Sequence, residues 1–224
     1  MTKVDFDDYA RKYTQLTSQQ TRLFDADNGY FARYKIDLMK SVSGLDRGDI
    51  LDFGCGIGLS APHLRKAFPG SRVVGCDPSQ ESLAVARGQD VEVDFVSPDA
   101  IGLGPQFDLV LASCVFHHIP PAERSGALQY CFERLRPGGS MFIFEHNPYN
   151  PVTRHLVNTC PFDADAILLT RRETTARLRA AGFKVGAAAY CLFFPQQLAA
   201  LRGIETSLGW LPFGGQYYVS GVRP

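Results

Sequence analysis

Apolar residues follow two different spacings along the chain. Between about residues 5 and 43 they recur at helical spacing, as Phe31, Tyr34 and Leu38 do. Beyond residue 48, short apolar runs rich in β-branched residues alternate with helical stretches. The runs that predict strands are residues 50–53, 72–76, 91–96, 107–112 and 141–144. The helical stretches between them are residues 59–68, 79–87 and 121–135.

Alternating strands and helices predict an α/β fold with a doubly wound, mostly parallel sheet and helices on both faces. Right-handed crossovers then place the ligand crevice at the carboxyl ends of the strands. After residue 146 the pattern is less regular. Residues 148–169 suggest a loop or short cap, and the apolar positions of 195–215 fit one helical face. A helix over 171–181 and strands over 183–194 and 216–222 complete the prediction.

The first strand runs into a glycine-rich turn. Gly54, Gly56 and Gly58 allow positive φ angles and a close approach of the backbone to a ligand. Dinucleotide-binding turns do the same for a pyrophosphate. Here Leu59 stands where their third glycine would be, and the Asp52 carboxylate before the turn would repel a pyrophosphate. The turn therefore favours a different nucleotide-like ligand.

Acidic residues end the next two strands. Asp77 follows the second strand, where a carboxylate can accept hydrogen bonds from ribose hydroxyls. Asp99 follows the third, placed to accept from an adenine amino group. These acids and the glycine turn all fall at one predicted edge of the sheet.

Five segments in this order resemble the motifs of the class I S-adenosylmethionine-dependent methyltransferases, over residues 48 to 146. The segments are LDFGCGIG at 51–58, GCDPS at 75–79, SPDA at 97–100, FDLV at 107–110 with VFHHI at 115–119, and LRPGG at 135–139. The resemblance implies a seven-stranded sheet whose last strand is antiparallel. It also implies S-adenosylmethionine as the cofactor, lying across the strand ends with its cationic aminoacyl end near Asp52.

The resemblance carries over to particular positions. The expected cofactor-binding residues are Asp52, Gly54, Gly56, Gly58, Asp77, Pro78, Asp99, Ala100 and Ser113. The candidate catalytic residues are His146, His117 and Glu145. His146 could take a proton from an acceptor hydroxyl near neutral pH, although its loop could instead be held by Asx-type hydrogen bonds. One histidine of the His117–His118 pair is expected to pack in the interior.

Asn147-Pro148-Tyr149 is similar to the Asn-Pro-Pro-Tyr signature of nucleic-acid amino-methylating enzymes. It lacks the second proline and follows the fifth strand rather than the fourth. We interpret this likeness as fortuitous.

The amino-acid composition limits the classes of partner that we expect for this chain. Lys and Arg balance Asp and Glu at 23 each, so nothing favours a phosphate backbone as partner. Six scattered cysteines show no C-x-x-C pair and no zinc-ligand spacing, which favours a reducing compartment and predicts no metal. The charged N-terminus is unlike a signal peptide, and no apolar run approaches a membrane span, so a cytoplasmic location is expected.

The sequence thus predicts a methyltransferase acting on a small molecule, in secondary metabolism or in sugar, lipid or cofactor biosynthesis. Oxygen, nitrogen and carbon acceptors stay open, and a homodimer is one expectation. Residues 1–45 are predicted to form a helical lid, and 46–224 the catalytic domain, with cap insertions near 147–170 and 195–215. One alternative is a non-catalytic S-adenosylmethionine-binding module. Another is a nicotinamide-dependent oxidoreductase, although Leu59 and Asp52 argue against it.

Overall fold

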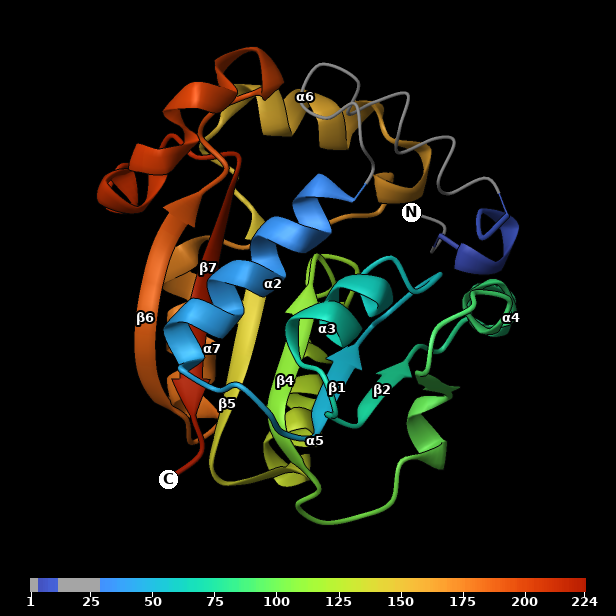
Figure 1. Cartoon of the computed structure of the whole chain (residues 1–224). Coiled ribbons are helices and arrows are strands. Elements are labelled where there is room, and N and C mark those ends of the chain that lie inside the picture. Colours follow the sequence, from blue (N-terminus) through green and yellow to red (C-terminus); the bar gives the residue numbers. More distant parts are fainter. Residues whose placement is uncertain (1–3, 12–28) are drawn as a thin grey trace.

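The fold is built on one seven-stranded sheet (Figure 1). The computed structural model describes residues 4–11 and 29–224. The strands are β1 (Ile50–Phe53), β2 (Val73–Cys76), β3 (Asp94–Val96), β4 (Phe107–Ser113), β5 (Leu135–His146), β6 (Lys184–Cys191) and β7 (Gln216–Val222). Their order is β3-β2-β1-β4-β5-β7-β6, and β7 is antiparallel to both of its neighbours. The predicted fold class, with its antiparallel last strand, is confirmed.

The helices connect these strands as the alternation predicts. The α-helices are α2 (Tyr30–Ser43), α3 (Ala61–Ala67), α4 (Gln80–Arg87), α5 (Arg124–Arg134), α6 (Pro151–Thr159) and α7 (Arg171–Ala180). The 3-10 helices are η1 (Phe6–Asp8), η2 (Pro98–Ala100), η3 (Pro161–Asp163) and η4 (Gln196–Leu208). Within residues 4–11 and 29–224, no helix is long and apolar enough to cross a bilayer.

Helices cover both faces of the sheet (Figure 1). On one face Leu128 of α5 and Leu178 of α7 pack against the strands. On the other, Ile36 and Met39 of α2 pack with Leu64 of α3. Burying a side chain of this size contributes about 1.5–3 kcal/mol. Helix α2 is therefore part of the core and holds its polar residues at fixed positions.

Strand register aligns the ends of the central strands. Phe53 of β1 pairs with Cys76 of β2 and Ala112 of β4, so Gly54, Asp77 and Ser113 follow at one level. Helix α6 and helix η4 lie beyond this carboxyl edge (Figure 1). The edge therefore gathers the residues for which the sequence predicts a ligand.

Three predicted elements differ from the structure. Strand β3 is shorter than predicted. Strand β5 begins at Leu135 rather than at 141, but its pairing with β4 is interrupted between Leu135 and Ser140, where Gly138 has a φ of +82°. The 195–215 segment forms a 3-10 helix interrupted at Leu198. Its apolar residues Leu201 and Ile204 are exposed, so this face does not join the core. The predicted helical residues 12–28 lie outside the described part of the chain.

Candidate cofactor and acceptor site

The glycine turn after β1 uses its three glycines in different ways. All three have positive φ angles. A Cβ on Gly54 would lie 2.6 Å from a methyl group of Val115, and one on Gly58 would lie 3.0 Å from the Phe95 ring. A Cβ on Gly56 would meet nothing within 4 Å. Packing therefore requires glycine at two positions, while Gly56 borders open space that a ligand can enter.

Asp52 brings a buried carboxylate to the base of this turn. Its side chain is almost fully enclosed, and its Oδ2 atom has no hydrogen-bond partner among the described residues. Burial and the nearby charge of Asp77 raise the pKa of Asp52 to about 7, while Lys35 opposes the shift. An unsatisfied buried carboxylate oxygen is costly, and a cationic ligand group would relieve that cost.

Asp77 links the end of β2 to the glycine turn. Its Oδ2 atom accepts from the backbone N–H of Gly56 at 2.8 Å, and its Oδ1 atom accepts from that of Ser79 at 2.9 Å. Burial raises the pKa of Asp77, although both N–H donors favour its ionised form. A carboxylate has about four acceptor positions, so two remain for ribose hydroxyls.

The other predicted cofactor residues lie along the same edge. Pro78 is exposed, as are Asp99 and Ala100 of η2. Ser113, at the end of β4, accepts a hydrogen bond from the Lys35 ammonium at 2.9 Å. These positions alone do not show which residues contact a cofactor. The predicted set of cofactor-binding residues therefore stays a prediction.

Lys35 and Cys114 form a polar pair that the sequence did not point to. Lys35 of α2 is buried, and its Nζ atom lies 3.3 Å from the Cys114 sulfur. Gln216 of β7 donates to the same sulfur at 3.3 Å. Although burial would raise the pKa of the Cys114 thiol, Lys35 and His146 lower it to about 6. Cys114 also has a positive φ of 59°, which marks a constrained position at the site.

Glu145 and His117, both predicted as catalytic residues, are buried and contact each other. Glu145 is fully buried, and its Oε1 atom accepts from the backbone N–H groups of Val115 and Phe116. Its Oε2 atom lies 2.6 Å from Nδ1 of His117, whose side chain is 1% exposed. Burial opposes both charges, but the pair lowers the pKa of Glu145 to about 2 and raises that of His117 to about 10. Each group is therefore held by the other, and a catalytic role for either one stays a prediction.

His146 is the predicted base that the structure leaves accessible. It is half-buried at the end of β5, with its ring 5.0 Å from that of His117. Asn147 beside it is buried, donates to the Pro212 and Gly214 carbonyls and accepts from the N–H of Tyr149. The loop thus has the predicted Asx-type bonds. Asn147 is engaged in holding the cap, in agreement with the view that its signature is fortuitous.

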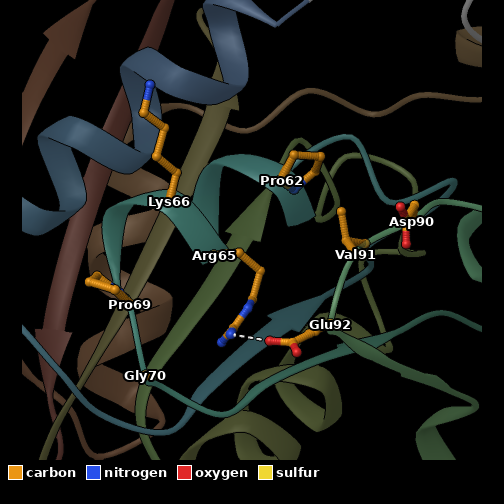
Figure 2. A pocket seen from close by; sticks show the side chains of 8 residues that line it. All are labelled: Pro62, Arg65, Lys66, Pro69, Gly70, Asp90, Val91 and Glu92. Carbon is orange, nitrogen blue, oxygen red and sulfur yellow. Dashed lines mark hydrogen bonds and ion pairs between the residues drawn. The ribbon is translucent and has the colours of Figure 1, made fainter.

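A shallow hollow elsewhere does not belong to this site. It has a volume of about 450 Å³ and lies between α3 and the segment before β3 (Figure 2). An ion pair between Arg65 and Glu92 (2.8 Å) crosses it. Its lining includes none of the predicted site residues.

Comparison with known proteins agrees with this geometry. Residues 51–141 match the family described as a methyltransferase domain. A small-subunit ribosomal RNA methyltransferase C from Pseudomonas entomophila is 28% identical over 62% of this chain and 46% of its own length. A trans-aconitate 2-methyltransferase from Azoarcus sp. is 32% identical over 56% of this chain and 49% of its own length. The chain spans about half the length of these curated relatives.

A solved structure from Thermotoga maritima shares the fold. It is described as an S-adenosylmethionine-dependent methyltransferase and a possible histamine N-methyltransferase. Its TM-score is 0.70 at 18% identity, with 98% of both chains covered. Residues 51–141 therefore match a methyltransferase domain, and the chain shares the fold of this solved structure. The predicted resemblance is confirmed over residues 51–141, and the enzyme class and cofactor of the whole protein stay predictions.

Proposed function

We propose that this protein transfers the methyl group of S-adenosylmethionine to a small-molecule acceptor. The unpartnered oxygen of buried Asp52, beside the open space at Gly56, is the observation that carries the proposal. Together they offer a negative group and an accessible backbone at one point of the sheet edge. That combination suits a ligand with a cationic aminoacyl end.

In this proposal, different residues of the carboxyl edge bind different parts of the cofactor. Asp52 receives the amino group, the turn at Gly56 passes close to the aminoacyl part, and Asp77 receives the ribose. The Lys35 ammonium, beside Ser113, lies within reach of a ligand carboxylate at the same end. S-adenosylmethionine supplies a methyl group already activated by its sulfonium. The protein's task is then alignment of the acceptor and exclusion of water.

His146 is the residue we propose as base for an acceptor that must lose a proton. His146 ends β5 at the carboxyl edge, and an imidazole within hydrogen-bond reach of an acceptor hydroxyl can act as a general base. An amine acceptor arriving neutral needs no such step. Phe193 and Phe194, both half-buried beside β6, favour a partly apolar acceptor, whereas Trp210 and Phe213 are exposed.

We also propose that the N-terminal segment covers the cofactor. Asp7 of η1 accepts from the Ser79 hydroxyl at 2.5 Å and from the Glu81 N–H at 3.2 Å, at the start of α4. Ser79 is itself hydrogen-bonded to Asp77. A segment anchored beside the proposed ribose ligand suits a lid.

Calorimetric titration with S-adenosylhomocysteine, in parallel with NADH, tests the cofactor site. We expect the sulfur ligand alone to bind. Asp77→Asn should weaken it by about 10- to 100-fold, the cost of losing hydrogen bonds to a charged group. Asp94→Asn, an exposed acid on the neighbouring strand β3, should bind as the native protein does. A folded protein that binds NADH instead would overturn the proposal.

Methyl transfer needs its own measurement. Release of S-adenosylhomocysteine with panels of hydroxyl, amine and activated-carbon acceptors should show turnover for at least one small molecule. Cofactor binding without turnover on any panel would favour a non-catalytic module.

A further inference from the structure

Two histidines and an aspartate converge beside a cavity of about 620 Å³. His117 and His118 follow β4, and Asp163 ends η3 in the cap. One ligand atom from each of the three lies within 4.8 Å of the others. All three residues border the cavity, together with the segments 119–121, 157–158 and 164–167.

The distances within this cluster are long for hydrogen bonds. The Asp163 Oδ1 atom lies 3.6 Å from Nε2 of His117 and 3.3 Å from Nε2 of His118. A charge-assisted hydrogen bond between such groups would be about 2.7–2.9 Å. Ligands at about 2.1 Å from a tetrahedral ion are separated by about 3.4 Å. The spacing therefore matches atoms that share an ion better than atoms that share a proton.

A second carboxylate orients His117. Its Nδ1 atom bonds to Glu145, which two backbone N–H groups hold in place. This contact directs Nε2 of His117 toward Asp163, the arrangement that metal-binding histidines commonly have. On the other side, Nδ1 of His118 faces Oδ1 of Asp165 at 3.9 Å. Both of these buried atoms lack a hydrogen bond in the described part of the chain.

Charge also favours a cation here. Glu145, Asp163 and Asp165 bring three carboxylates to two imidazoles. This largely buried group is rich in acidic side chains, and a divalent ion is a suitable counter-charge for them.

We propose that His117, His118 and Asp163 bind a divalent transition-metal ion of the zinc type, with one coordination position open to the cavity. Two imidazole nitrogens and one carboxylate oxygen are ligands that such ions prefer, and catalytic zinc sites keep a fourth position for water or substrate. The inference does not depend on methyl transfer. The bound ion would be able to coordinate an oxygen or nitrogen atom of a molecule that enters the cavity.

Metal titration of the whole chain tests the site. After removal of metal with a chelator, Zn²⁺ is added in a calorimeter and Co²⁺ under visible spectroscopy. We expect one ion per chain, a tetrahedral cobalt spectrum without thiolate charge-transfer bands, and a rise in the melting temperature with Zn²⁺. Absence of stoichiometric binding, or thiolate bands that implicate Cys114, would overturn the proposal.

Variants locate the ion. His118→Gln and Asp163→Asn should each weaken Zn²⁺ binding by about 100-fold or more, since loss of an outer contact alone costs 10- to 100-fold. His155→Gln removes an exposed histidine of α6 and should bind as the native protein does. Equal affinity in all three variants would assign the ion elsewhere and refute the site. Should either variant fail to fold, the cobalt spectrum of the native chain decides alone.

Discussion

Asp52 is a carboxylate that the folded chain buries without giving both oxygens a partner. Its pKa is raised from 3.8 to about 7, chiefly by burial. The folded protein therefore holds this proton more tightly than the unfolded chain does. By linkage, the contribution of Asp52 to stability is most favourable below about pH 4, declines as the pH rises toward 7, and then stays constant.

Asp52→Asn should remove this dependence on pH. We expect the variant and the native protein to have similar free energies of unfolding near pH 4. Near pH 8 the variant should be more stable by at most about 4 kcal/mol, at 1.36 kcal/mol per unit of pKa. Urea unfolding without cofactor at several pH values measures the difference, with Asp94→Asn as control. Parallel stability curves for Asp52→Asn and the native chain would contradict the raised pKa.

Lys35 sets the charge of its neighbour Cys114. Replacing it with Met keeps an apolar stem but removes the ammonium 3.3 Å from the sulfur. We expect the pKa of the Cys114 thiol to rise from about 6 by roughly 1–3 units. Thiolate absorbance across pH, with the matching Cys114→Ser protein subtracted, reports the change. Lys66→Met, an exposed position on α3, should leave the titration where it was.

The positions of the candidate cofactor-binding residues at the carboxyl edge of the sheet could be predicted, because the order of strands and helices places them there. Asp52, Asp77 and the glycines follow or end apolar runs, and parallel strands bring such positions together. Lys35 could not be predicted, since a lysine on a helix is usually solvated and only the packing of α2 turns it inward. Asp163 lies far from His117 and His118 in the sequence. No short sequence motif therefore indicates that the three residues could bind a metal ion together.

Substitutions in the glycine turn can distinguish an effect on folding stability from an effect on ligand binding. Gly54→Ala places a methyl group 2.6 Å from Val115 at a positive φ, so we expect a loss of about 2–4 kcal/mol in the free energy of unfolding. Val115→Ala in the same chain should recover part of that loss. Urea unfolding measures both. No recovery would mean that backbone strain, rather than the Val115 contact, sets the cost.

Gly56→Ala should behave differently because its Cβ points to open space. We expect a cost of about 1–2 kcal/mol from the positive φ alone. The affinity for S-adenosylhomocysteine should fall more than tenfold, because the methyl group would occupy the ligand's approach. Unfolding and calorimetry on the same preparation separate the two effects. Unchanged affinity would move the cofactor away from this turn.

Elements with a strong pattern were predicted well, and those without one were not. The helices between β1 and β5 were found because apolar spacing and caps agree, as with Ser79, whose hydroxyl accepts from the Ser82 N–H. The η4 segment has helical spacing but exposes Leu201 and Ile204, so its pattern does not reflect a core. The early start of β5 rests on the pairing of Leu135 with Phe107, which precedes an interruption of the strand pairing around Gly138.

At the scale of the molecule, we expect the predicted cap segments to control which molecules reach the strand ends. Helices α6 and η4 lie over the carboxyl edge (Figure 1), and Asn147, which precedes α6, donates to the Pro212 and Gly214 carbonyls of the segment that follows η4. Relatives that share the domain act, by their names, on acceptors as different as ribosomal RNA and trans-aconitate. We therefore expect the choice of acceptor to depend on this part of the chain and on the charge of the whole surface. The homodimer stays a prediction.

The balance of 23 basic and 23 acidic residues argues at this scale against a nucleic-acid acceptor. A protein that neutralises several phosphates loses about 10³- to 10⁵-fold in affinity between 50 and 200 mM salt. We expect no saturable binding of a labelled RNA hairpin to this protein at micromolar concentration and about 200 mM salt, and only a weak dependence on salt below that. Fluorescence anisotropy measures both. Tight binding with a steep salt dependence would show a local basic surface that the net charge conceals. The acceptor would then be sought among structured RNAs, while the cofactor site at Asp52 and Asp77 would stand unchanged.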